Sequence, residues 1–157
     1  MSTQPPDGSL KSRLHADLTT AIKARDELRT ATLRMVLSAI TTEEVSGSQA
    51  RELSDDEVLK VLAREGKKRR EAATAFDAGN RAELADRERA EGTVIDDYLP
   101  KQLDDEELRA LVATAVAQAG ASGPQAMGAV MKIATPLVAG RAEGGRVAAE
   151  VKRQLAG

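Results

Sequence analysis

Apolar residues recur every three or four positions along most of the chain, which is the period of an α-helix with one buried face. No stretch alternates apolar and polar residues as a half-buried strand does, and β-branched or aromatic runs are missing. The positions that define the helical stripes are Leu10, Leu14, Leu18, Ala21, Ile22, Leu33, Val36, Leu37, Ile40, Leu59, Leu62, Ala73, Phe76, Val94, Ile95, Tyr98, Leu108, Leu111, Val112, Ala115, Val116, Met127, Val130, Met131, Ala134, Val147, Val151 and Leu155.

Capping residues and glycines set the expected ends of these helices. Ser9 is placed as an N-cap, Ser54 with Glu57 forms a capping-box pattern, and Asp104 with Glu107 forms another. Two further starts are expected at Asn80 with Glu83 and at Ser122 with Gln125, and stops are expected at Gly47, Gly79, Gly120 and Gly140. The predicted helices lie within residues 9–27, 27–45, 54–79, 80–98, 104–120, 122–139 and 147–155, and Gly144 with Gly145 is expected in the turn before the last of them.

The amino-acid composition of the sequence changes at Pro100, in "YLPKQL". Charged residues are dense before it, whereas the chain from Leu108 onward is mostly Ala, Val, Leu and Gly. We therefore predict an all-α protein with an N-terminal helical domain of about four helices (residues 9–99) and a C-terminal three-helix bundle (residues 100–157). Residues 1–8 are expected to form a disordered tail.

Composition restricts the possible partners and location. Aromatic residues make up 1% of the chain, so Ala, Leu, Val, Ile and Met must build the core. The net charge is −2, which means that any binding of a polyanion has to be local. The chain has no cysteine, no apolar run of membrane-spanning length and no signal-peptide pattern, and from these absences we expect a cytoplasmic protein without a membrane contact.

The residues point to no catalytic group, metal or cofactor. The only histidine, His15, has no cysteine or second histidine to share a metal with, so a structural role is expected. The acidic runs Asp55–Glu57 and Asp104–Glu107 could serve as acid and base or bind a cation, but both lie in first helical turns, where negative charge complements the helix dipole. Capping is therefore the preferred interpretation.

A glycine-rich junction, "AGRAEGGRV" at residues 139–147, allows two interpretations. It lacks the Lys and Ser or Thr of a Walker loop and the preceding strand of a dinucleotide loop. Its glycines suit a plain joint between two helices. Alternatively, Arg141 and Arg146 flank the turn and could contact an anion.

The stretch "KVLAREGKKRR" places Lys60, Arg64, Lys67 and Lys68 on one helical side, opposite the apolar stripe. This basic stripe is either a solvated face balanced by nearby acids or a contact surface for a polyanion. Arg69 falls near the apolar stripe instead, so we expect it between helices and paired with a carboxylate.

Several segments together resemble the GatB/YqeY family, whose domain is shared with the tail of the B subunit of glutamyl-tRNA amidotransferase. They are "LKSRLHADLTTAIKARDELRTATLRMVLSAI", "KKRREAATAF", "YLPKQL", "MGAVM" and "GRAEGGRV". The resemblance implies an N-terminal helical domain and a C-terminal three-helix domain of the kind associated with contacting the tRNA body. Three positions depart from the family pattern: Ala72, Ala126 and Ala129, the last replacing a common lysine. Basic residues retained in the tail-like domain are Lys101, Lys132, Arg141, Arg146, Lys152 and Arg153.

The sequence thus predicts a non-catalytic accessory protein that binds tRNA or associates with a tRNA-dependent amidotransferase or another translation-related protein. A carbon–nitrogen ligase label with glutamine as amido-N-donor would follow from the resemblance alone, because the chain has no ATP-dependent or ammonia-releasing apparatus. The alternative is a helical protein–protein interaction module with no RNA role. An autonomous amidase-like enzyme is the least favoured hypothesis.

Overall fold

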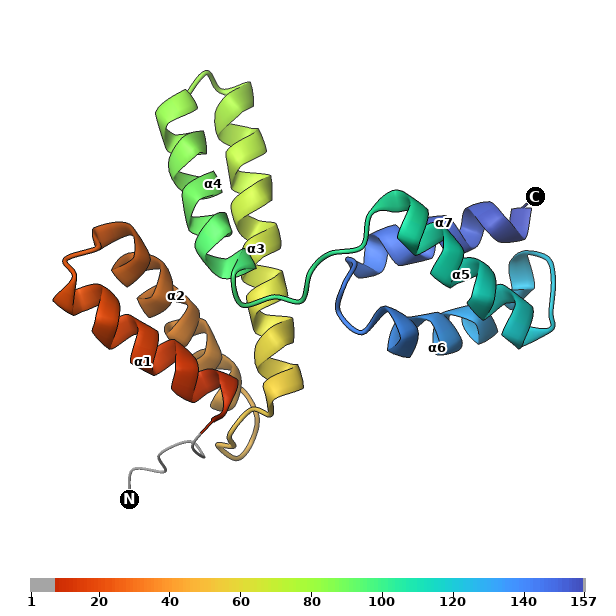
Figure 1. Ribbon diagram of the computed structural model, residues 1–157, viewed down its shortest axis with the longest axis horizontal. Helices are drawn as coiled ribbons and strands as arrows, with labels where there is room; N and C mark the ends of the chain where they lie inside the picture. The colour runs from red at the N-terminus through yellow and green to blue at the C-terminus, as the bar shows by residue number, and fades with distance from the viewer. Residues whose placement is uncertain (1–7, 157) are drawn as a thin grey trace. The chain divides into compact units, whose positions relative to one another are not determined.

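The computed structural model describes residues 8–156, and within them it contains seven α-helices, one 3₁₀ helix and no strand (Figure 1). The predicted all-α class is confirmed. The predicted disordered tail, apart from Gly8, lies outside the described residues. The helices are α1 (Leu10–Lys23), α2 (Glu27–Glu44), α3 (Asp55–Ala78), α4 (Ala82–Asp96), α5 (Asp105–Ala119), η1 (Pro124–Ala126), α6 (Met127–Val138) and α7 (Gly144–Ala156).

The chain divides into two compact units, one ending at Tyr98 and the other beginning at Leu99. In the N-terminal unit α1 packs on α2 and α3 packs on α4, while α2 also contacts α3 and α4 (Figure 1). The largest side chains that are fully enclosed come from all four helices: Leu14, Leu33, Ile40, Leu62 and Ile95. The apolar stripes predicted from the sequence therefore meet in one core.

The C-terminal unit has a core of its own, to which α5, α6, η1 and α7 all contribute. Val112, Ala115, Val130, Ala134 and Val151 are fully buried at its centre. These side chains are all small, so the three helices can pack closely.

Local capping signals explain most helix starts. The Ser9 hydroxyl accepts a hydrogen bond from the Ser12 amide at 3.1 Å. Capping boxes form at Ser54 with Glu57 and at Asp104 with Glu107, as predicted; in the second, the Glu107 amide donates to Asp104 Oδ1 at 2.7 Å. Each cap satisfies amides that would otherwise lack a partner in the first helical turn.

Two predicted starts and one predicted stop are wrong. Asn80 adopts a left-handed conformation (φ 60°) in the turn after α3, and α4 begins after Arg81 without a side-chain cap. The Ser122 box does not form, because Gly123 (φ 86°) and Pro124 open a 3₁₀ turn that leads into α6. α2 ends at Glu44, three residues before Gly47. At this end the buried Glu44 carboxylate binds Lys11 Nζ at 2.9 Å and accepts a hydrogen bond from the Leu53 amide at 3.2 Å.

Tyr98 fastens the end of the N-terminal unit to α1. Its side chain is buried, its hydroxyl donates to Asp17, and the Arg13 guanidinium carbon lies 4.7 Å from the ring centroid. Burial raises the pKa of Tyr98 to about 12, and the hydrogen bond to the Asp17 carboxylate adds to the shift. Arg29 and Asp97 form a further ion pair here, at 3.8 Å.

The Tyr98 contact predicts a pH-dependent stability. Because the folded pKa of Tyr98 is about 12 and the ordinary value is 10.0, the unfolded chain loses this proton first as pH rises. The contribution of Tyr98 to the free energy of unfolding is therefore complete below pH 10 and falls as pH rises through the folded pKa. Tyr98→Phe should lower stability at neutral pH by about 1–3 kcal/mol and make its alkaline decline shallower. Urea unfolding of both proteins across the alkaline range measures this, and equal slopes would contradict the assignment.

We also predict that the two units fold independently. The segment between Asp96 and Asp105 is not helical, and Lys101 is exposed within it. Limited trypsin digestion should therefore cut first after Lys101, and the two fragments should each retain helical circular dichroism. A Lys101→Gln variant, which removes the cleavage site, is the control. Loss of helix in both isolated fragments would show that the units share their stability.

Candidate nucleic-acid interface

The glycine-rich junction connects α6 to α7. α6 ends at Val138, after which Ala139 (φ 50°) and Gly140 (φ 77°) both take the left-handed conformation that reverses the chain. The Gly144–Gly145 pair, expected in the turn, instead forms the first residues of α7. The segment is thus a helix joint, and whether its arginines also contact an anion depends on where their guanidinium groups lie.

Arg141 closes the C-terminal end of α6. Its Nε donates to the Val138 carbonyl at 3.1 Å and its Nη2 donates to the Leu137 carbonyl at 2.9 Å. Carbonyl groups at a helix C-terminus lack partners within the helix and carry partial negative charge, so a guanidinium group is a favourable partner. None of the ion pairs among residues 8–156 involves Arg141, and its positive charge is not neutralised by a carboxylate.

Arg146 ties α7 to the segment that precedes α5. Its Nη1 donates to the Leu103 carbonyl at 3.1 Å, and its Nη2 binds Asp105 Oδ1 at 3.0 Å. The Leu103 amide in turn donates to the Arg141 carbonyl at 2.7 Å. We call these two main-chain contacts of Leu103, to Arg141 and to Arg146, the Leu103 clamp.

The predicted basic stripe lies exposed on α3, but most of its charge is paired. Arg64 binds Glu43 at 3.4 Å, Lys67 lies 4.0 Å from Glu71, and Lys68 lies 3.2 Å from Glu65. Lys60 is exposed, and no ion pair among residues 8–156 includes it. The pairs of Arg64 and Lys67 are exposed and therefore weak, whereas Lys68 pairs with the buried Glu65, so an incoming phosphate would compete against acids already in place.

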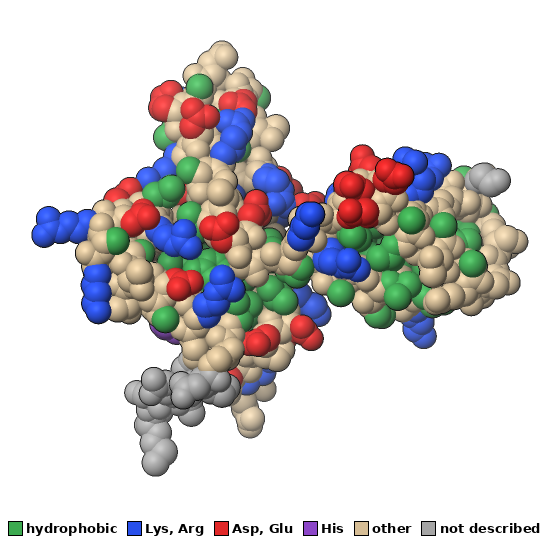
Figure 2. Space-filling model, in the orientation of Figure 1, with side chains coloured by type: hydrophobic (Ala, Val, Ile, Leu, Met, Phe, Trp, Pro, Cys, Tyr) green, Lys and Arg blue, Asp and Glu red, His purple; other side chains and the backbone are tan. Residues whose placement is uncertain are grey.

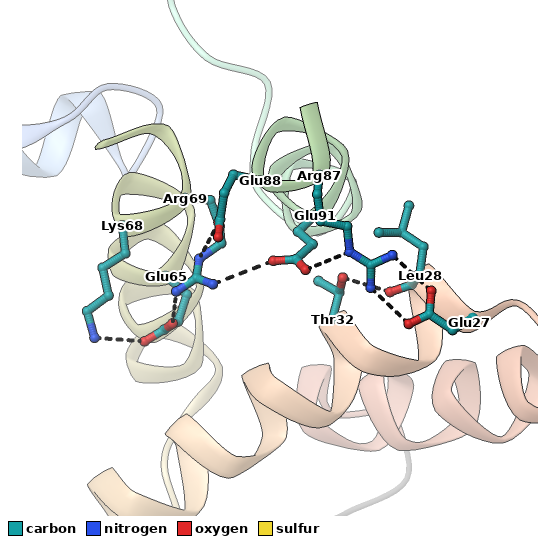
Figure 3. Close-up of polar contacts among 9 residues, drawn as sticks. All are labelled: Glu27, Leu28, Thr32, Glu65, Lys68, Arg69, Arg87, Glu88 and Glu91. Atoms are coloured by element: carbon teal, nitrogen blue, oxygen red, sulfur yellow. Dashed lines mark hydrogen bonds and ion pairs between the residues drawn. The ribbon is translucent and has the colours of Figure 1, made fainter. Parts of the chain in front are cut away.

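The prediction for Arg69 is confirmed (Figure 3). Its side chain is 21% exposed and lies between α3 and α4, where Glu65, Glu88 and Glu91 approach it at 4.0, 3.4 and 3.5 Å. Glu91 also accepts from Arg87 at 3.0 Å, and Arg87 reaches Glu27 of α2 at 2.8 Å. The charges join three helices, so this arginine serves packing.

The other predicted contact residues lie in the C-terminal unit. Lys101 precedes α5, Lys132 is on α6 and Lys152 is on α7; all three are exposed, and none belongs to an ion pair among residues 8–156. Arg153 is different, because it binds both oxygens of Glu150, at 2.9 and 2.6 Å, and holds the pKa of Glu150 at about 2.

A cleft of about 360 Å³ between α5 and α7 brings together three arginines: Arg109, Arg146 and Arg153. Asp105 and Glu150 share the cleft and pair with the latter two. Sequence reasoning missed Arg109 because it neighbours the others only after α5 and α7 pack together. No local spacing signal connects residues that far apart in the chain.

Features associated with catalysis or membranes are also placed by the structure. His15 is exposed on α1, and within residues 8–156 no three His, Asp or Glu side chains gather where they could hold a metal ion. The acidic runs Asp55–Glu57 and Asp104–Glu107 both supply helix caps, which supports the interpretation preferred from the sequence. Among the described helices, none combines the length and apolar character needed to span a bilayer.

The family model described as Yqey-like protein matches residues 11–155. The chain belongs to this YqeY-like protein family. Relatives named "Altered inheritance of mitochondria protein 41, mitochondrial" come from Clavispora lusitaniae (34% identity over 105 residues, 65% of this chain and 60% of the relative) and Meyerozyma guilliermondii (31% over 99 residues, 63% and 50%). A third, from Lachancea thermotolerans, is 31% identical over 88 residues, or 56% and 46%. The chain thus spans about half the length of these relatives.

The relatives contradict the cytoplasmic location expected for this YqeY-like protein, because all three are named as mitochondrial proteins. That expectation rested on the absence of cysteines, of an apolar run of membrane-spanning length and of a secretory signal-peptide pattern. None of these properties separates the cytosol from the interior of a mitochondrion, so the inference was physically too weak for the conclusion.

The Leu103 clamp generates a stability prediction. Arg146→Ala removes the charged donor to the buried Leu103 carbonyl and should lower the free energy of unfolding of the C-terminal unit by about 1–2 kcal/mol. Arg153→Ala, on the same helix, removes an exposed guanidinium group whose ion pair lies within α7, and should lower the free energy of unfolding less than Arg146→Ala does. Native-state hydrogen exchange of amides in α5–α7 measures both. Equal losses in the two variants would show that the clamp contributes no more than a surface ion pair.

Proposed function

We propose that this YqeY-like protein is a non-catalytic accessory protein that contacts folded tRNA mainly through its C-terminal unit. The observation that carries the proposal is a set of four basic residues in that unit without a carboxylate partner among residues 8–156: Lys101, Lys132, Arg141 and Lys152. Unpaired positive charge on a surface attracts phosphate and gains the entropy of released counterions.

The charge balance of the two units supports this assignment. Residues 99–157 contain seven Lys and Arg against six Asp and Glu, a net charge of +1. Residues 1–98 contain 16 against 19, a net charge of −3. Four of the six acids of the C-terminal unit lie together in the cap and first turn of α5, so the rest of its surface is predominantly basic. The α3 stripe, with most of its charges paired, is the secondary contact in this proposal.

Folded RNA suits this surface better than unstructured RNA. Residues 99–157 include no aromatic side chain on which a splayed base could stack. Recognition would therefore depend on phosphate positions and on the shape of a helical RNA, as in a tRNA body. The resemblance to the amidotransferase B-subunit tail also supports tRNA as the ligand, and it makes an amidotransferase the candidate protein partner. Any carbon–nitrogen ligase chemistry would then belong to that partner.

A protein-interaction role is the second candidate, because one surface of the C-terminal unit is apolar. Figure 2 shows hydrophobic side chains gathered on the visible face of this unit, with Lys and Arg side chains at the edge and acidic side chains grouped on one side. Such a surface is typical of a contact with another protein more than with RNA.

The RNA proposal predicts salt-dependent tRNA binding that needs the unpaired lysines. Lys132→Ala with Lys152→Ala removes two phosphate contacts without touching a hydrogen-bonded group, so the slope of log affinity against log salt should fall by about 1.4–1.8. Lys67→Ala with Lys68→Ala removes the same charge from the paired stripe and should have a smaller effect. Titrations of folded tRNA and of an unstructured RNA of equal length, at several salt concentrations, measure both variants.

Two results would contradict tRNA binding by the C-terminal unit. One is the absence of detectable binding by the full chain at low salt. The other is an unchanged affinity and slope in the Lys132 and Lys152 double variant while its helicity is intact. Preference for the unstructured RNA would contradict recognition of shape.

A further inference from the structure

An open groove of about 580 Å³ runs along α5 in the C-terminal unit. One wall is the segment Lys101–Leu103, and Arg141 closes one part of it. The α5 side chains that line it share one helical stripe and are mainly small or apolar: Glu107, Ala110, Leu111 and Thr114. With a rise of about 1.5 Å per residue, this stripe extends roughly 10 Å, the length of two helical turns.

Three hydrogen bonds to main-chain carbonyls fix the wall of the groove that Lys101–Leu103 forms. In the Leu103 clamp the Leu103 amide donates to the Arg141 carbonyl at 2.7 Å and Arg146 donates to the Leu103 carbonyl at 3.1 Å. Gln102 Nε2 adds a bond to the Gly140 carbonyl at 3.3 Å. The wall is therefore fixed to the α6–α7 joint, and an occupant would not have to order it.

The groove is lined by two basic side chains and one acidic side chain. Lys101 and Arg141 have no carboxylate partner among residues 8–156. The only acid in the lining, Glu107, already accepts the Asp104 amide in the capping box. The groove thus combines an apolar floor with two positive charges that no carboxylate among residues 8–156 neutralises, although Arg141 also donates from Nε and Nη2 to carbonyls of α6.

The geometry points to a docking site for a short amphipathic helix from a partner protein, with two apolar residues about one turn apart and a carboxylate that reaches Lys101 and Arg141. Two helical turns fit the length of the floor, and helices bind grooves through residues at i and i+4. A nucleic-acid strand would leave Ala110 and Leu111 without a matching apolar partner. Lys101 and Arg141 belong to both proposed surfaces, whereas Lys132 and Lys152 contribute only to the tRNA contact, because they lie outside the groove.

The test uses the isotope-labelled full chain and three synthetic peptides of about 14 residues with equal helix content. The first carries leucines at i and i+4 and glutamates on the same face. The second replaces those glutamates with lysines, and the third keeps the glutamates but moves one leucine to the opposite face. Backbone amide shifts at residues 101–103, 107–114 and 141 should saturate below about 1 mM of the first peptide. The other two peptides should need concentrations at least tenfold higher.

Two substitutions on α5 provide a matched pair. Ala110→Glu places a carboxylate on the groove floor and should weaken binding of the first peptide at least tenfold. Ala113→Glu makes the same change at an exposed position of α5 outside the groove and should alter binding less than twofold. Comparable binding of all three peptides, or equal effects of the two substitutions, would overturn the proposal. So would tRNA shifting the groove amides when the first peptide does not, which would make the groove an RNA surface.

Discussion

The small size of the core side chains is the constraint on which the rest of the structure depends. With one Phe, one Tyr and no Trp in 157 residues, Tyr98 is the one aromatic ring buried among residues 8–156, and elsewhere aliphatic side chains must fill the space between helices, so the helices approach closely. α3 and α4 approach each other at the buried Gly66 and Gly92, where an added Cβ would make ordinary contacts, 3.6 Å from Ile95 Cγ2 and 3.8 Å from Arg69 Cβ. The close crossing encloses the stem of Arg69 and forces its guanidinium group to find carboxylates between the helices.

At the helix ends, charged side chains complete the hydrogen bonding of the backbone. Arg141 binds carbonyls that the end of α6 leaves without partners, and Arg146 binds the carbonyl of Leu103, which precedes α5. The Val138 and Leu103 carbonyls are partly buried, and a carbonyl shielded from water is destabilising without a donor, so these arginines have a structural reason to stand where they do. A glycine- and arginine-rich motif is for this reason weak evidence for an anion site until the partners of its guanidinium groups are known.

The helices and their stripes were predictable because their signals are local. The capping boxes at Ser54 and Asp104 need only the residues of one turn, and the helical angle of Arg69 was enough to place it between helices. The predictions at Asn80 and Ser122 failed because the side chains suit a cap but the backbone does not form one. Asn80 adopts a left-handed turn, and a 3₁₀ helix begins directly after Ser122 and Gly123. The groove and the cluster around Arg109 were out of reach, because they arise where α5 meets segments about 40 residues away.

The position of Tyr98 has a consequence for how the two units can be observed. It is the only tyrosine of a chain without tryptophan, and it is buried against α1, so nearly all near-ultraviolet absorption and intrinsic fluorescence originate in the N-terminal unit. The C-terminal unit, with its groove and its unpaired lysines, is optically silent in this range. A single tryptophan introduced there would report on that unit alone, against a background that belongs entirely to its neighbour.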